Sequence, residues 1–170
     1  MKIERMLPTF IILFLVSFQA IANDEEIIEG KAPKGIEVLS TVIDSHEGML
    51  ENRGRHGLRE FCYEADSYVV YSTNLLGNGY QLSKGAPKSL ECSKINKPIE
   101  SKNKLGMHIG MSKKSVEDLI GLGSLKEEKT IIWQSVIFID GRRFDLQTHV
   151  ALLFKEGRLA WLSVFTTTTS

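Results

Sequence analysis

Three strand-like segments near the carboxyl end, separated by two glycine turns, constrain the fold of this chain more than any other feature. Residues 131–139 are almost entirely apolar, residues 146–154 alternate between apolar and polar side chains, and residues 159–165 carry large apolar side chains on both faces. Such runs are typical of strands. Asp140-Gly141 and Glu156-Gly157 stand between them, and dipeptides of this kind favour tight hairpins. The pattern predicts a three-stranded antiparallel meander.

A short amphipathic segment precedes the meander. Ser112 is placed to cap the amino end of a helix, and Gly121 can end it in the left-handed conformation. Between them, Val116, Leu119 and Ile120 form one apolar stripe. The segment is shorter than the roughly 12–15 residues at which an isolated helix becomes even marginally stable. We therefore expect its stripe to pack on the meander.

Weaker strand signals fill the first half of the chain. β-Branched and aromatic residues gather there in short runs, and Asn78-Gly79 favours a two-residue hairpin because both positions tolerate a positive φ. A polar passage follows, and it has little apolar surface with which to hold itself in place. The expected strands cover residues 36–43, 60–65, 68–76 and 80–83, and the polar passage covers residues 84–104.

The first 22 residues have the three parts of a secretory signal peptide. Two basic residues open the chain, residues 9–18 are nearly all apolar, and Ala20-Ile21-Ala22 supplies the small residues that a signal peptidase reads. We expect cleavage between Ala22 and Asn23, and export to the bacterial periplasm or beyond. The alternative is an uncleaved anchor, although the apolar run is shorter than the roughly 20 residues that span a bilayer.

Length and charge suit a single exported domain. Removal of 22 of the 170 residues leaves 148, the length of one domain. Basic and acidic residues are equal in number, at 21 each, which argues against nucleic acid as a partner because its binders usually carry a basic excess. No transmembrane segment is expected after signal removal. We expect a flexible lead-in over residues 23–35 and one domain over 36–170, made of a β part (36–83), the polar connection (84–104) and the helix with its meander (105–165).

Two cysteines, Cys62 and Cys92, lie in the part expected to be exported. In an oxidising compartment such a pair is most simply a disulfide. A bridge here would stabilise the fold by about 3.5 kcal/mol on the chain-entropy model. The competing interpretation is a reactive thiol served by His56 or His108, but an exposed free thiol would be oxidised outside the cytoplasm. We predict the disulfide.

The helix and the strands after it resemble a known family. Residues 105–112 read LGMHIGMS and are followed by Val116 and by Leu119-Ile120-Gly121. This is similar to the "GM[ST]xxxV…LG" helix signature of small SmpA/OmlA-type envelope proteins and of the related β-lactamase-inhibitor-like folds. The closing LLFKEGRLAWLSVF resembles the last hairpin of that family. The resemblance covers about residues 104–165. It implies a helix packed on an antiparallel sheet in a non-enzymatic envelope protein that scaffolds or binds others, and it carries over no binding residues.

No arrangement of residues predicts catalysis or metal binding. The four histidines (His46, His56, His108 and His149) show no ligand spacing, and no HExxH or Cys/His cluster is present. Ser101 and Lys104 match the Ser-x-x-Lys spacing of penicillin-recognising enzymes, but the companion motifs are missing. We therefore predict no catalytic residue, no metal and no cofactor.

One dense basic cluster is a candidate partner-binding site. Arg53, Arg55, His56 and Arg59 gather in the segment ENRGRHGLRE. Their charges could contact phosphates of lipopolysaccharide, carboxylates of peptidoglycan or an acidic protein surface. The alternative is a solvated charge cluster that its flanking glutamates neutralise.

These signals predict an α+β fold in which a mostly antiparallel sheet carries one short helix, at about residues 112–120, packed on a C-terminal three-stranded meander. The leading hypothesis for function is a non-catalytic, periplasmic or secreted protein that binds or scaffolds a protein or other component of the cell envelope. One alternative is an envelope hydrolase or thiol enzyme that uses Cys62 or Ser101. Another is a structural protein that faces lipid or glycan.

Overall fold

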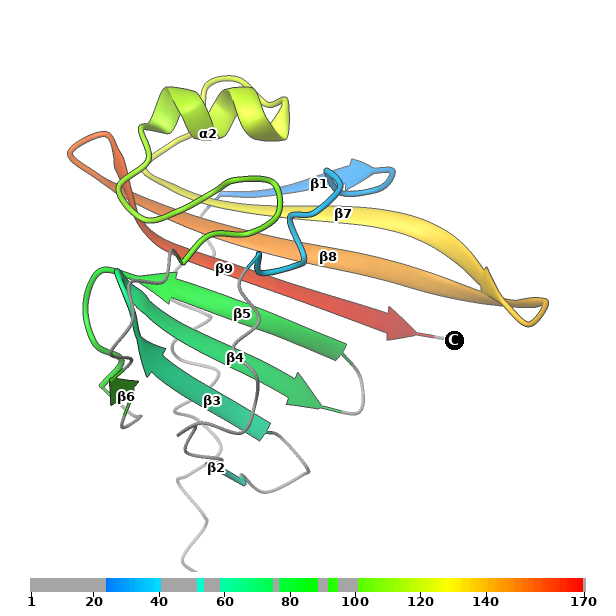
Figure 1. Cartoon of the computed structure of the whole chain (residues 1–170). Coiled ribbons are helices and arrows are strands. Elements are labelled where there is room, and N and C mark those ends of the chain that lie inside the picture. Colours follow the sequence, from blue (N-terminus) through cyan, green and yellow to red (C-terminus); the bar gives the residue numbers. More distant parts are fainter. Residues whose placement is uncertain are drawn as a thin grey trace, which may run out of the picture.

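The computed structural model of the chain describes residues 24–40, 52–53, 59–74, 77–88, 92–94 and 101–169. Within these residues, nine strands form one mixed sheet, and a single short helix lies over one face of it (Figure 1). This described part of the chain is mainly β with one helix, which agrees at that level with the predicted α+β class. The elements are β1 (Glu25–Glu29), β2 (Asn52–Arg53), β3 (Arg59–Glu64), β4 (Tyr68–Asn74), β5 (Gly77–Ser83), β6 (Ser93–Lys94), α2 (Lys113–Ile120), β7 (Glu128–Ile139), β8 (Arg142–Lys155) and β9 (Arg158–Thr169).

The sheet joins the two halves of the chain. Its strands follow the order β1-β7-β8-β9-β5-β4-β3-β2, with β6 beside β3. Most neighbours are antiparallel, and the β1–β7 and β3–β6 pairs are parallel. The predicted meander is present as β7, β8 and β9, and β9 then pairs with β5 of the N-terminal half. One sheet therefore runs through the whole described chain.

The two predicted turns of the meander have the expected geometry. Asp140 and Gly141 have φ values of 49° and 75°, and Glu156 and Gly157 have φ values of 53° and 70°. Positive φ at both central residues matches the right-handed twist of the strands that they join. The last strand is longer than the sequence suggests. β9 continues to Thr169 between β8 and β5, four residues past residue 165, where the meander was predicted to end.

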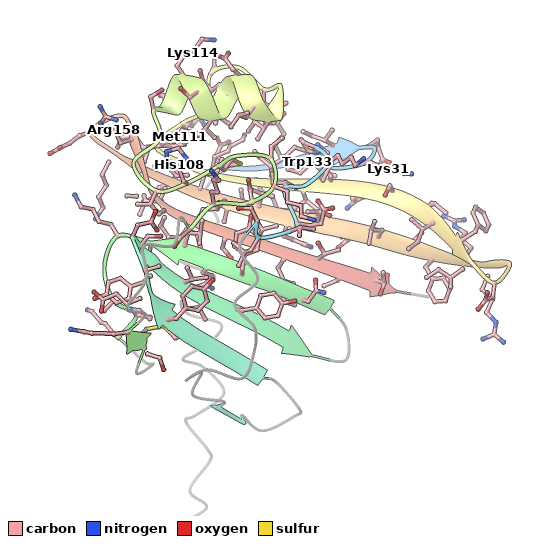
Figure 2. The ribbon with its side chains drawn as sticks, in the orientation of Figure 1. Lys31, His108, Met111, Lys114, Trp133 and Arg158 are labelled. Carbon is pink, nitrogen blue, oxygen red and sulfur yellow. A yellow bond between two sulfur atoms is a disulfide. The ribbon has the colours of Figure 1, made fainter. Side chains whose placement is uncertain are left out.

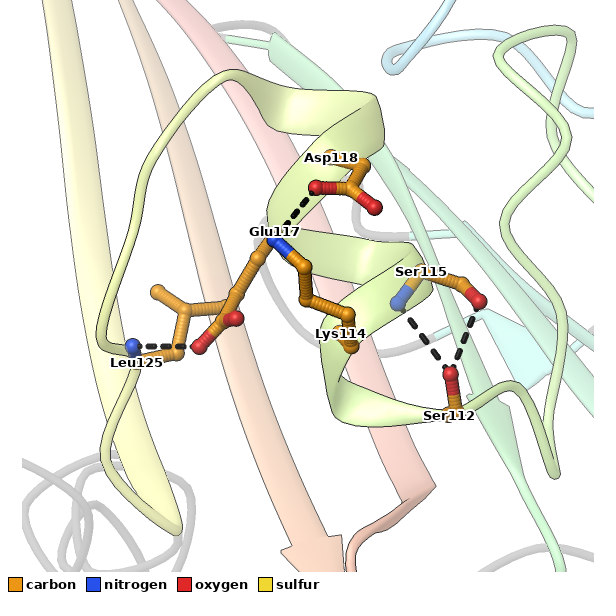
Figure 3. A network of polar contacts seen from close by, with 6 residues as sticks. All are labelled: Ser112, Lys114, Ser115, Glu117, Asp118 and Leu125. Carbon is orange, nitrogen blue, oxygen red and sulfur yellow. Dashed lines mark hydrogen bonds and ion pairs between the residues drawn. The ribbon is translucent and has the colours of Figure 1, made fainter.

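Helix α2 has the predicted caps, and Figure 3 shows the one at Ser112. The Ser112 hydroxyl accepts a hydrogen bond from the Ser115 N–H at 3.1 Å, and Gly121 is left-handed, with its N–H donating to the Glu117 carbonyl at 3.0 Å. The Glu117 carboxylate also accepts from the Leu125 N–H at 2.9 Å, which fixes the loop that leads into β7. Lys114 pairs with Asp118 one turn later on the exposed side.

The helix is docked on the meander, as predicted. Val116 and Ile120 are buried in the same core cluster as residues of β7, β8 and β9. The chain before the helix is also tied to the β8–β9 turn, because the Leu159 N–H donates to the Met111 carbonyl at 2.8 Å and an Arg158 guanidinium N–H donates to the Gly110 carbonyl at 3.0 Å. Figure 2 shows Met111 and Arg158 at this end of the sheet. Packing on the sheet therefore supplies the stability that so short a helix lacks in isolation.

A buried polar network fastens two loops to the helix-covered face. The Tyr80 hydroxyl donates to the Ile36 carbonyl at 2.6 Å and accepts from the Asn103 amide at 2.9 Å. Asn103 in turn accepts from the Met107 N–H at 2.9 Å. Burial raises the pKa of Tyr80 well above its ordinary value, so the hydroxyl stays protonated and available as a donor. Residues 36–40 form turns, bends and one isolated bridge, from Leu39 to Asn103, rather than the predicted strand. Ile36 is fully buried, and residues 41–43 lie outside the described chain.

Two further predictions for the N-terminal half are corrected. The segment 23–35, predicted as a flexible lead-in, contributes β1 to the edge of the sheet from residue 25 onward. The predicted Asn78-Gly79 turn lies inside β5, where Gly79 pairs with Ser72 and Phe165. A side chain at Gly79 would place its Cβ 2.6 Å from the Phe165 ring and closer still to the Val164 carbonyl. Glycine is needed there for close approach between strands, not for a turn.

The predicted disulfide joins Cys62 of β3 to Cys92, with the two Cα atoms 4.6 Å apart. It spans 30 positions of sequence and fixes the short strand β6, which follows Cys92, beside β3. A covalent link suits this passage because its described residues add no side chain to the hydrophobic core cluster.

Candidate functional site

The predicted site residues are only partly within the described chain. Ala22, Asn23, Arg55 and His56 lie outside it. Arg53 and Arg59 face each other across the β2–β3 pair, so the backbone brings at least these two cluster positions together. The interpretation of the basic cluster as a binding site stays a prediction.

Neither nucleophile of the enzyme alternative is placed for chemistry. The Cys62 sulfur is bonded to that of Cys92. Ser101 is buried, its hydroxyl has no hydrogen-bond partner, and Lys104, which would act as its base, is exposed. The two do not share a helix, whereas Ser-x-x-Lys chemistry needs one to bring them together. Among the described residues, no group of three acidic, histidine or cysteine side chains is arranged to hold a metal ion.

The feature that stands out is the β7–β8 hairpin, which projects beyond the strands on both sides of it (Figure 1). β1 pairs with β7 only as far as Gln134, and β9 reaches β8 only at Asp145. The hairpin continues without a break in register to Ile139, opposite Arg142. Residues 135–144 thus form a two-stranded extension, which we name the projecting ribbon.

The projecting ribbon exposes apolar side chains. Val136 is 42% exposed, Phe138 72% and Ile139 49%. Of the five large hydrophobic side chains that are exposed in the described chain, these three share the ribbon. Val136 and Phe138 lie on one face and Ile139 on the other, because side chains alternate along a strand. Single exposed apolar residues are ordinary on protein surfaces, but a cluster of them marks an interaction site.

Charged side chains border this apolar cluster. Asp140, Arg142 and Arg143 are exposed at and beside the turn. An Arg143 guanidinium nitrogen lies 3.4 Å from an Asp145 carboxylate oxygen, and both side chains are more than half exposed. A pair so open to water contributes little to stability. The resulting pattern, an apolar centre with a polar rim, is typical of surfaces that bind other proteins.

One long edge of the projecting ribbon also carries unpaired backbone groups. The Thr130 N–H and the Gln134 carbonyl make hydrogen bonds of 3.1 and 2.7 Å with the segment that contains β1. Every second residue of a strand directs its backbone groups to the same side. Val136 and Phe138 therefore direct their N–H and carbonyl groups to this side as well. Beyond Gln134, no strand in the described part of the chain pairs with β7 there.

The β7 edge is unpaired beyond Gln134 because β1 ends there. Lys129 holds the start of β1, with its amine 2.9 Å from a Glu26 carboxylate oxygen and 3.3 Å from one of Asp24, and Lys126 lies 3.2 Å from Asp24. The Glu26 carboxylate raises the pKa of Lys129, and Lys126 holds the pKa of Asp24 below its ordinary value. At the other end Gly30, with a φ of 133°, turns the chain away from β7. β1 is fixed and short, so the ribbon beyond it stays uncovered.

This site was not among those predicted, although the sequence contains a signal for it. Residues 131–139 are apolar at nearly every position, whereas a strand with one solvated face alternates. Such a run needs cover on both faces. The described structure provides that cover only over the inner part, since Ile131, Ile132 and Trp133 are buried and three of the last four residues are exposed.

Comparison of the chain with family models, with curated proteins and with solved structures finds no match. The resemblance to the SmpA/OmlA type therefore stays a prediction. Across the described residues, the structure has no helix with the length and apolar character to cross a lipid bilayer.

Proposed function

We propose that the chain is an exported, non-catalytic protein of the bacterial cell envelope that binds a protein partner through its projecting ribbon. The observation that carries the proposal is the concentration of Val136, Phe138 and Ile139 on a structural extension that the described helix and loops do not cover. An aromatic side chain surrounded by aliphatic ones and rimmed by charge is the usual centre of a protein interface.

Physical arguments favour binding over a structural role for these side chains. Complete burial of one phenylalanine side chain is worth about 1.5–3 kcal/mol, and Phe138 takes little of that in the isolated chain. The ribbon gains no stability from its apolar tip until another surface covers it. The tip also increases the risk of aggregation. Selection for binding a partner explains why the apolar tip is present although it adds no stability and increases the risk of aggregation.

The disulfide supports the proposed compartment. Cys62 and Cys92 are bonded, and such bonds persist in the periplasm and outside the cell but are rare in the cytoplasm. A disulfide and the lack of a membrane-spanning helix in the described residues are consistent with an exported protein. The signal peptide lies outside the described chain and stays a prediction.

Site-specific photo-crosslinking in living cells tests the proposal. p-Benzoylphenylalanine replaces Phe138 in one variant and Ile27 in a matched control, because Ile27 is also an exposed hydrophobic residue, at 57%, but lies on β1 away from the ribbon. We expect one discrete protein adduct from position 138 and none from position 27. The same adduct from both positions would contradict the proposal, and so would no adduct from either.

The protein recovered in the adduct then gives a direct test. Its affinity for the purified chain is measured by calorimetry for the wild type, Phe138→Ser and Ile27→Ser. We expect the Phe138 variant to lose at least roughly tenfold in affinity, the usual effect of truncating an aromatic anchor, and the Ile27 variant to bind like the wild type. Equal affinities for all three would show that the ribbon is not the binding surface.

A further inference from the structure

We infer that the partner binds the projecting ribbon as an added β-strand: an extended, apolar segment of another protein pairs with the open edge of β7 at Val136 and Phe138. This inference rests on the proposed function and states the form in which the ribbon recognises its partner.

The backbone of the edge defines the partner's conformation. Val136 and Phe138 direct their N–H and carbonyl groups to the side that β1 occupies further along β7, and there the described chain supplies no partner for them. The spacing of these groups matches another extended strand and neither a helix nor a lipid chain. A lipid surface would leave the same groups without hydrogen bonds, at a large cost. Asp140, at the apex of the turn, would also have to enter the lipid first.

The two edges of the ribbon differ in a way that selects β7. Phe138 lies opposite Arg143, and in this position both residues turn their backbone groups outward, one to each edge. The β8 edge thus presents a charged residue, which is the common protection of an edge strand against pairing. The β7 edge presents valine and phenylalanine and has no such protection.

The geometry of the open β7 edge limits which segment of a partner can pair with it. The added strand continues the line of β1 after Gly30 has turned away. Its side chains on one face meet Val136 and Phe138, and those on the other face meet Ile137 and Ile139. β-Branched and aromatic side chains pair well in such cross-strand positions. The occupant is therefore an extended segment with apolar residues on both faces and with no proline at the pairing positions.

A second copy of this chain fits the edge poorly. Antiparallel pairing of two ribbons that sets Val136 opposite Phe138 of the other copy would set Asp140 of that copy opposite Gln134. That position is taken, because Gln134 pairs with Glu29 and accepts a hydrogen bond from the Gly30 N–H. The register that uses both open residues thus brings one hairpin turn into the end of β1. We assign the edge to a different protein.

Proline substitution separates backbone pairing from side-chain contact. The reporter is p-benzoylphenylalanine at Ile139, and the measured quantity is the yield of the partner adduct in cells. Val136→Pro, Phe138→Pro and the control at the opposite edge, Arg143→Pro, are each compared with alanine at the same position. None of these three prolines removes an N–H that bonds within the hairpin, so thermal unfolding and circular dichroism should show folded protein in each case.

We expect each β7 proline to lower the adduct yield at least roughly fivefold below the matching alanine variant, the factor for one lost backbone hydrogen bond. Arg143→Pro should match Arg143→Ala, because the backbone at the β8 edge takes no part in the pairing. Equal yields for proline and alanine at both positions, with Phe138→Ala itself impaired, would overturn strand addition and leave the proposed function standing. No change in any variant would overturn both. An adduct of the chain with itself would overturn the assignment to a different protein.

Discussion

The inner and outer halves of the β7–β8 hairpin have a similar apolar sequence but different surroundings. In the inner half, Ile131 and Trp133 are buried beneath α2 and its loops, and β1 and β9 flank the hairpin. In the outer half, Val136 and Phe138 are exposed and neither flanking strand is present. Apolar character in a strand therefore does not by itself reveal the role of that strand. The neighbours decide whether it is core or binding surface.

The largest expected effect sharpens the contrast at Trp133, which is only 5% exposed and lies in the core cluster (Figure 2). Trp133→Ala should lower the free energy of unfolding by about 3–5 kcal/mol, because it removes the largest side chain of the inner half and leaves a cavity. Urea denaturation of the oxidised protein measures this. A loss below about 1 kcal/mol would show that the inner half is not a packed core.

The cover of the inner half can be weakened without touching the hairpin. Ser112→Ala removes the acceptor for the Ser115 N–H at the start of α2 and should cost about 1 kcal/mol. Lys114→Ala, which removes only an exposed ion pair with Asp118, serves as the control and should change stability less. The same denaturation experiment compares the two variants. A larger loss for Lys114→Ala would mean that capping does not hold the helix in place.

His149 should make the stability of the inner half depend on pH. This residue pairs with Ile132 and Phe165 in the sheet. Burial lowers the pKa of His149, against a smaller opposing effect from Glu25. The unfolded chain therefore binds the proton more readily. The contribution of His149 to the free energy of unfolding is fully present above the unfolded pKa of about 6.5. It is lost as the pH falls through that value toward the pKa in the folded state. Unfolding measured from pH 8 to pH 5 should show this loss in the wild type. The variant His149→Gln should not show this part of the pH dependence.

The smallest expected effect is at Phe138. Phe138→Ala should change the free energy of unfolding by no more than about 0.5 kcal/mol, since the side chain is 72% exposed and surface substitutions have small effects. Together with the loss of binding predicted above, this would separate function from stability in one strand. A cost comparable to that of Trp133→Ala would assign the outer half to the core and remove the basis of the binding site.

Local signals in the sequence were sufficient for the C-terminal half. Ser112 and Gly121 mark the ends of the helix, and Asp140-Gly141 and Glu156-Gly157 mark the turns, because caps and tight turns depend on the residues that form them. The disulfide followed from an even pair of cysteines.

Features that depend on distant contacts were not predictable in the same way. β1 looks like a polar terminal segment, and only its pairing with a strand more than 100 positions away makes it ordered. Gly79 looks like part of a turn until Phe165 is packed over it. The open edge was missed for the same reason, because the apolar run of residues 131–139 does not show where β1 and β9 stop.

Residue-resolved amide exchange on the purified, unliganded chain measures whether the β7 edge of the projecting ribbon is open. The amides of Ile132 and Gln134 face β1, the amide of Ile137 faces β8, and those of Val136 and Phe138 face the open edge. We expect the first three to exchange slowly, and Val136 and Phe138 to exchange at close to the rate of an unprotected chain. Slow exchange at Val136 and Phe138, independent of protein concentration, would show that the edge is already paired and would contradict the account.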